Sequence, residues 1–294
     1  MRKTIGTLLF ICLALSANAQ LLWKVSGNGL EKPSYIFGTH HLASYSILQK
    51  VEGLMPAFDA TSQVVGELKM SDMQSSAAMQ IMQQQMMMTG DQTIKGLFTE
   101  DEYAMVNGFV KENMQFDLAM MPKLKPAFIT NNIVLLLYMK NVKGYNPQEQ
   151  LDTYFQTKAQ EKGKEVVALE TMEFQVNLLF NSTPVQRQAE VLACTLSDVD
   201  KTLSDTQKLA DAYMAQDIKA ILELALKKEG TKCDPLPGEM EALTDNRNIA
   251  WMEKLPDLMK EQPTFVAVGA LHLVGKKGLI NLFKEAGYTI EPVK

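Results

Sequence analysis

Two copies of one short pattern constrain this sequence more than any other feature. In residues 35–42 and again in residues 266–273, an apolar, strand-like run is followed by Gly-x-x-His. The two segments contain all 3 histidines of the 294-residue chain, which would not be expected if histidines were spread through it for packing. We expect each strand to end at its glycine, the glycine to let the backbone turn, and His41 and His272 to project from the carboxyl edge of a sheet. Ligands bind at this edge in α/β folds.

Short β-rich runs alternate with helical stretches along the chain, and this order predicts an α/β fold. We expect a central mixed sheet with surrounding helices and a helical insertion, and the two Gly-x-x-His strand ends meeting at one site. The predicted strands are residues 21–26, 34–37, 62–68, 165–169, 263–268 and 288–292, and the first two read as a hairpin. The predicted helices include one that follows Thr99, one over residues 148–162, and two within residues 184–230.

The first 19 residues have the organisation of a secretory signal peptide. A charged start precedes an apolar run over residues 5–17, which ends at the small-residue site Ala17-Asn18-Ala19. The run is too short to span a bilayer permanently, and no later window is long enough. We therefore expect cleavage near Ala19, export to the periplasm or the medium, and no stable membrane insertion. The mature chain, 20–294, is expected to be one domain with helical segments at about 71–162 and 184–261.

Composition excludes several classes of protein. The chain is 46% hydrophobic and 21% charged, which argues against disordered and fibrous proteins. Its net charge is −5, and it has no run of basic residues that would follow a phosphate backbone, so we expect no nucleic-acid partner. Cys194 and Cys233 remain after processing, and because an exported compartment permits disulfides we expect them to be paired. Two free, buried thiols are the alternative.

Glu67 follows the apolar residues Val64 and Val65 of the predicted strand 62–68 and should emerge from the sheet at the same edge as His41 and His272. Two histidines and one glutamate are a common catalytic metal set, because three protein ligands leave one coordination position open for water. The ion expected is Mn²⁺, Co²⁺ or Zn²⁺, and the sequence does not choose among them. A hydrogen-bonded, half-buried imidazole is the alternative for each histidine. His40 has no counterpart in the second segment, where Leu271 stands, and is left out of the ligand set.

Methionines crowd a polar, Gln-rich segment at positions 70, 73, 79, 82, 86, 87 and 88. Several of them are three or four residues apart, so one helix face is expected to be methionine. Such a face is typical of an adaptable core or groove lining, and a Cu(I) site is the alternative.

The sequence resembles the TraB/GumN family from about Leu22 to the C-terminus. The resemblance rests on both Gly-x-x-His segments, Glu67, Leu169-Glu170-Thr171 with Gln175, Arg247-Asn248, and the C-terminal segment VGALHLVGKKGL. It implies an α/β fold akin to erythromycin esterase and the haem-associated ChaN proteins. Animal relatives, the TIKI proteins, act as metal-dependent proteases on secreted signals.

Carried over residue by residue, the resemblance implies an active site of His41, His272 and Glu67. It also marks Glu170 as a candidate proton shuttle, and Arg247 with Asn248 as a candidate clamp for an oxyanion or a carboxylate. Asp152 lies in a segment like the family's Leu-Asp-x-Tyr, where a helix-capping role is an equal alternative to catalysis.

These observations favour an exported metal-dependent hydrolase, a TIKI-like metalloprotease that acts on a peptide or protein substrate through an activated water. A second interpretation is metal-free, esterase-like hydrolysis, in which His41 is a general base oriented by Glu67 or Glu170. A third is a protein that binds haem, a metal or a signal peptide without turnover. The sequence specifies neither the substrate nor the oligomeric state.

Overall fold

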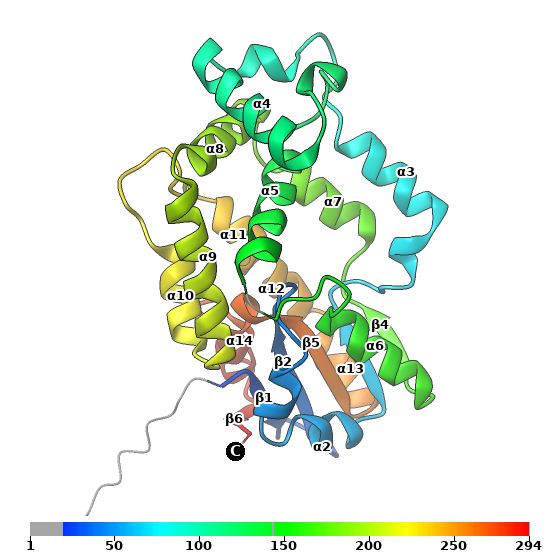
Figure 1. The fold of residues 1–294 in the computed structure, drawn as a ribbon. Coiled ribbons are helices and arrows are strands. Elements are labelled where there is room, and N and C mark those ends of the chain that lie inside the picture. Colours follow the sequence, from blue (N-terminus) through cyan, green and yellow to red (C-terminus); the bar gives the residue numbers. More distant parts are fainter. Residues whose placement is uncertain (1–19, 143, 294) are drawn as a thin grey trace, which may run out of the picture.

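The structure, a computed structural model, describes residues 20–142 and 144–293 (Figure 1). The expected signal peptide, residues 1–19, lies outside the described residues. The strands are β1 (Leu22–Ser26), β2 (Ser34–Thr39), β3 (Gln63–Gly66), β4 (Glu165–Ala168), β5 (Thr264–Gly269) and β6 (Thr289–Pro292). The α-helices are α1 (Ile47–Lys50), α2 (Leu54–Asp59), α3 (Ser76–Gln85), α4 (Glu100–Met114), α5 (Pro126–Asn141), α6 (Leu151–Glu161), α7 (Met172–Asn181), α8 (Val185–Ser197), α9 (Val199–Met214), α10 (Ile218–Leu226), α11 (Glu239–Leu243), α12 (Asp245–Met252), α13 (Leu255–Glu261) and α14 (Leu279–Glu285). Four short 3-10 helices, η1 (Asp72–Gln74), η2 (Ile94–Leu97), η3 (Leu118–Met120) and η4 (Ala270–Leu273), complete the list.

The six strands form one mixed sheet in the order β4-β3-β5-β2-β1-β6. The four strands β4, β3, β5 and β2 are parallel, so their carboxyl ends lie at the same edge. β1 pairs antiparallel with both β2 and β6, which confirms the predicted hairpin of the first two strands. The expected α/β class with a central mixed sheet is confirmed.

One of the two Gly-x-x-His glycines ends its strand as expected. Gly269 is the last residue of β5, whereas β2 continues one residue past Gly38, and neither glycine adopts a positive φ. They allow close approach instead. A Cβ at Gly38 would lie 3.0 Å from the Cα of Ala270, and one at Gly269 would lie 3.3 Å from Oε1 of Glu67. The missing side chains therefore let η4 pack over β2 and let the Glu67 carboxylate reach the backbone of β5.

Three helices, not the expected two, occupy residues 185–226. Asp198 and Asp217 each accept hydrogen bonds from backbone N–H groups of the following turn, so each begins a new helix, α9 and α10. The helix predicted to follow Thr99 is confirmed as α4, which begins with a capping box between Thr99 and Glu102. Gly163, with φ of +66°, follows α6, as expected for a residue that ends a helix.

Of the methionines in residues 70–88, Met79 and Met82 lie three residues apart in α3, and Met73 lies in η1. Ser75 is extended and caps α3 through its side chain, so the segment is divided into η1 and α3. No helix in the described part of the chain is both long and apolar enough to cross a membrane.

Two hydrophobic clusters hold the molecule together. The larger packs around the sheet and includes Phe37, Phe155 and Phe265. The smaller is built by α4, α5, α8 and the segments near them, here called the helical lobe. The lobe lies beyond the carboxyl edge of β2, where His40 packs against Tyr138 of α5 (Figure 1). The site at this edge is therefore enclosed on one side by helices.

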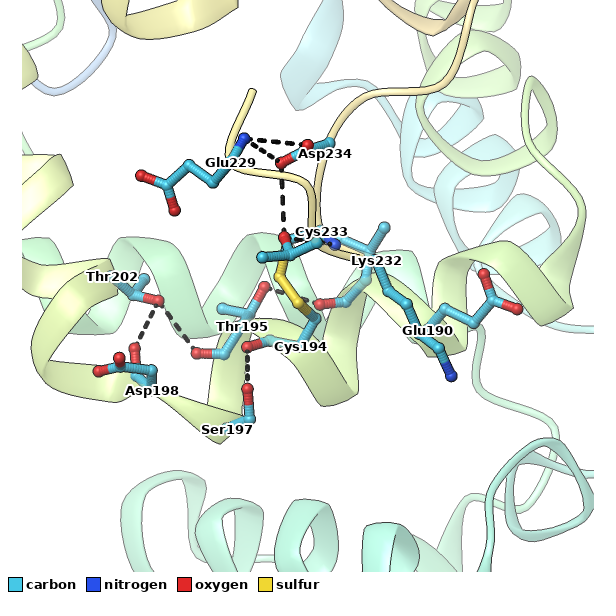
Figure 2. The surroundings of a disulfide bond; sticks show 12 residues. Glu190, Cys194, Thr195, Ser197, Asp198, Thr202, Glu229, Lys232, Cys233 and Asp234 are labelled. Atoms are coloured by element: carbon cyan, nitrogen blue, oxygen red, sulfur yellow. Dashed lines mark hydrogen bonds between the residues drawn. A yellow bond between two sulfur atoms is a disulfide. The ribbon is translucent and has the colours of Figure 1, made fainter. Parts of the chain in front are cut away.

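A disulfide joins Cys194 of α8 to Cys233 in the loop between α10 and α11, as predicted (Figure 2). The buried guanidinium of Arg187, also on α8, donates to the backbone oxygens of Lys232 and Asp234 on either side of Cys233. Its Nε also donates to Glu239 at the start of α11, over 3.1 Å. The loop is thus fastened to the helical lobe by one covalent and several polar contacts.

Replacing both cysteines, Cys194→Ser with Cys233→Ser, should lower the free energy of unfolding by roughly 4 kcal/mol, because the link restricts the unfolded chain across a sequence separation of 39. Urea unfolding followed by circular dichroism measures the change. Wild-type protein unfolded in a reducing agent is the matched control and should behave like the double variant. Equal stability of the oxidised wild type and the double variant would contradict the prediction.

Candidate functional site

Four parallel strands deliver polar side chains to one place at the carboxyl edge of the sheet. His41 follows β2, Glu67 follows β3, Glu170 follows β4, and His272 lies in η4 directly after β5. The ladder of β3 and β4 continues past the strands, since Leu169 N–H donates to Gly66 O and Glu170 N–H to Glu67 O, each over 2.9 Å. The two glutamates therefore leave the sheet side by side.

Arg247 of α12 lies at the centre of the site, with its side chain only 9% exposed. Nε and Nη2 bind the two oxygens of Glu170 over 2.8 and 2.7 Å, and Nη2 also donates to Oε2 of Glu67 over 2.6 Å. Nη1 donates to Leu243 O and to Nε2 of His272, over 3.0 and 3.1 Å. All five N–H groups of the guanidinium are thereby used.

Each glutamate accepts further hydrogen bonds beside those from Arg247. Gln175 donates to both carboxylates, over 3.0 Å to Glu67 and 2.9 Å to Glu170. Trp251 donates from its indole to Glu170 over 2.8 Å, and the backbone N–H of Gly269 donates to Glu67 over 2.8 Å. Two carboxylates share one guanidinium, so this cluster carries a net negative charge at neutral pH.

Asn248 fixes the orientation and the tautomer of His272. Its Nδ2 donates to the backbone oxygens of His272 and Lys277, so its Oδ1 faces Nδ1 of His272 at 2.7 Å. Nδ1 must therefore carry the proton, and Nε2 presents a lone pair toward Arg247 and toward Oε1 of Glu67, which is 3.7 Å away. Asn248 is fully buried with both polar groups engaged, which favours a positioning role over the expected clamp for an oxyanion.

His41 is held in the corresponding way by a carboxylate. Its Nδ1 lies 3.2 Å from Oδ2 of Asp152, while Oδ1 of Asp152 accepts a hydrogen bond from Thr39. Asp152 is buried at the first turn of α6, whereas the imidazole of His41 is 73% exposed. The carboxylate in contact with His41 is thus Asp152, and not Glu67 or Glu170 as the metal-free interpretation expected.

The site holds its two histidines in opposite protonation states. Burial lowers the pKa of His272 to about 4, so this ring is neutral at pH 7. The hydrogen bond and charge of Asp152 raise the pKa of His41 above its usual value, so this ring is positively charged. Burial alone would raise the pKa of Glu67, but the nearby His272, Arg247 and His41 more than offset it and lower the pKa to about 2.

His40, which the expected ligand set omits, contacts aromatic side chains of α5 and α9. Its ring packs against Tyr138 and Tyr213, and its Nδ1 accepts a hydrogen bond from Leu42 N–H. Burial lowers the pKa of His40 to about 4, so this ring is also neutral at pH 7.

Comparison with protein families gives a match over residues 21–292 to the TraB/PrgY/gumN family. The chain belongs to this family. The match includes every residue of the site described above. Comparisons with curated proteins and with solved structures found no match.

The structure of this TraB/PrgY/gumN chain brings most of the expected site residues into direct contact. Glu67, Glu170, Arg247, Asn248 and His272 form one hydrogen-bonded cluster. His41 and Asp152 form a pair of their own at the end of β2. In the part of the chain that the structure describes, no three His, Cys, Asp or Glu residues are close enough together to hold a metal ion as they stand.

Sequence reasoning missed Trp251 and treated Gln175 as a matching residue without a role. Trp251 donates to Glu170 and its ring lies 4.3 Å from that of His272, measured between centroids. A signal was available, because Trp251 is four residues after Arg247 and three after Asn248, and such residues share a face of a helix. The Gly269 N–H donor could not be found from side-chain patterns at all.

By NMR, the titration of His41 should be widely separated from those of His40 and His272. We expect the pKa of His41 above 6.5 and those of His40 and His272 near 4, because Asp152 stabilises the charged form of His41 and burial disfavours it in the others. Asp152→Asn should return His41 toward about 6.5 and leave His272 unchanged. A His272 that titrates near 6.5 would contradict the assigned tautomer and its burial.

Proposed function

We propose that this TraB/PrgY/gumN protein is an exported metal-dependent hydrolase that acts on a peptide, with a divalent ion held by His41, His272 and Glu67. The observation that carries the proposal is the anchoring of both imidazoles through Nδ1. Asn248 holds His272 and Asp152 holds His41, so Nε2 is left as the coordinating nitrogen of each ring. Histidines that bind catalytic metals are oriented in this way by a carboxylate or carbonyl partner.

The donor set fits such an ion in its chemistry. His272 is neutral, Glu67 is ionised, and the cluster of Glu67, Glu170 and Arg247 has a net negative charge that favours a cation. The three residues do not yet form a site. Nη1 of Arg247 lies against Nε2 of His272 and takes its lone pair, and His41 lies in its own pair with Asp152. Binding of an ion therefore requires that this hydrogen bond be released, that His41 approach Glu67 and His272, and that His41 lose its proton.

The residues of the chain then have distinct roles. When bound, the ion supplies activation of water and polarisation of the substrate carbonyl. The N–H of Arg247 that leaves His272 becomes a free donor beside the reacting carbonyl, while Glu170 keeps the guanidinium in place through two hydrogen bonds. Because both oxygens of Glu170 already accept hydrogen bonds, holding Arg247 suits it better than the shuttle role expected from the sequence.

A metal-free hydrolase is the second candidate, and the His41–Asp152 pair favours it. An imidazole oriented by a buried carboxylate is the usual arrangement of acid–base catalysis. Since His41 is positively charged at pH 7, it would act first as a general acid toward the leaving group, and not as the general base expected from the sequence.

Metal content separates the candidates. Mature wild-type protein, stripped and reloaded with Mn²⁺, Co²⁺ or Zn²⁺, should hold close to one ion per chain by elemental analysis. His41→Ala and His272→Ala should lose it, and His40→Asn, a neighbouring histidine outside the site, should retain it. A peptide library incubated with the wild type and read by mass spectrometry should show cleavage that a chelator abolishes. Negligible metal in every variant, with cleavage that survives chelation, would favour the metal-free hydrolase, and no cleavage at all would favour a binding protein.

Asn248→Ala should weaken metal binding by about 10- to 100-fold, because the oriented tautomer of His272 is lost while all three ligands remain. Titration calorimetry with the same ion measures the change, and thermal unfolding confirms that the variant folds. Asn246→Ala, at an exposed asparagine of the same helix, is the matched control and should bind the ion as the wild type does. Unchanged affinity in Asn248→Ala would remove the orienting role assigned to this residue.

A further inference from the structure

A cavity of about 870 Å³ adjoins the polar cluster and is used by none of the steps above. It lies between the residues that follow β3 and β4 and helices α7, α11 and α12. Arg247 and Glu170 form part of its wall, and so does Trp251, whose ring packs against His272. The cavity therefore shares its wall with the candidate site.

The lining of this cavity is largely apolar. Large side chains of Leu169, Met172, Phe174 and Leu178 alternate with the small side chains of Ala168, Ala242 and Ala250. Phe174 is 47% exposed and Met73, also in the wall, is 37% exposed. Exposure of these apolar side chains to water is unfavourable, and binding of an apolar group would remove them from water and lower the free energy. A volume of this size is typical of sites for small molecules or large side chains.

The polar groups of the lining have an excess of positive charge. Apart from the paired Arg247 and Glu170, the charged residues are Lys69, Lys254 and Asp72. Lys69 and Asp72 are exposed, and Lys254 is tied by its ammonium to Leu169 O over 2.7 Å. The net positive charge of the lining would attract an anionic group. The cavity therefore suits a ligand that has an apolar group with an anionic group next to it.

We propose that this cavity binds a large apolar side chain of the peptide substrate, with a carboxylate next to it that pairs with Lys69 and Lys254. The proposal rests on the proposed function, because it assigns the class of peptide that the same site receives. The carboxylate has two sources, the C-terminus of the peptide or an acidic side chain beside the apolar residue. With the apolar side chain in the cavity, the adjoining backbone lies beside Arg247 and Glu170.

Binding of four short peptides to metal-free wild-type protein tests the proposal by titration calorimetry. They are acetyl-Gly-Phe with a free carboxylate, acetyl-Asp-Phe-amide, acetyl-Gly-Phe-amide and acetyl-Gly-Ser with a free carboxylate. We expect one of the two anionic phenylalanine peptides to bind most tightly, which identifies the source of the carboxylate. The neutral phenylalanine peptide should bind more weakly, and the serine peptide weakest of all. A serine peptide that binds as tightly as the phenylalanine peptides, or no binding by any peptide, would overturn the proposal.

Variants locate the binding in the cavity. Ala250→Phe fills it from α12 and should weaken binding of the phenylalanine peptides by about tenfold or more, and Ala242→Phe is a second filling variant should the first not fold. Ala104→Phe, at an exposed alanine of α4 outside the cavity, is the matched control and should bind as the wild type does. Lys69→Met should remove the advantage of the anionic peptides. Equal affinities in wild type and a folded cavity-filling variant contradict the proposal.

The outcome is independent of the hydrolase proposal, because neither metal nor turnover enters the measurement. Loss of metal binding in His272→Ala together with unchanged peptide affinity in Ala250→Phe would support the hydrolase and reject the cavity. The reverse result would reject the metal and support the cavity.

Discussion

The arrangement of this site depends on one buried guanidinium. Arg247 joins the ends of β3 and β4, through Glu67 and Glu170, to η4, through His272, and it uses every N–H group to do so. Removing a partner from a buried charge is costly, because the remaining charge stays away from water without compensation. Arg247 thus holds the strand ends together and also occupies the lone pair of His272 Nε2. The hydrogen bond that stabilises the fold is therefore the one that must break before an ion can bind.

Much of the fold and of the site could be predicted because the polar residues of the site come directly after strands in the sequence. The paired Gly-x-x-His segments begin within β2 and β5, which are neighbouring parallel strands, and Glu67 and His272 emerge close together at one edge. Three features could not be predicted from the pattern. The close packing that both glycines permit depends on the groups that lie against them, and the helix starts at Asp198 and Asp217 are set by local caps. The pairing of His41 with Asp152, 111 positions along the chain, is a tertiary contact without a local signal.

The two histidine segments look equivalent in sequence and differ in three dimensions. In the ladder of β2 and β5, Gly38 pairs with Val268 and Thr39 pairs with Gly269. The register of the two Gly-x-x-His segments is therefore offset by one residue. Beyond the strands, His272 enters a 3-10 helix and is buried, and His41 lies in a turn and is largely exposed. A repeated motif has thus produced one neutral and one charged imidazole, each with its own orienting partner.

The disulfide has a mechanical consequence for this site. It fastens the loop before α11 to α8, and α11 leads with a single intervening residue into α12, which carries Arg247, Asn248 and Trp251. A shift of the helical lobe therefore pulls on the helix that orients His272 and forms a wall of the apolar cavity. The cross-link acts as a tether, so that α8 of the helical lobe and the loop that leads to this helix cannot separate.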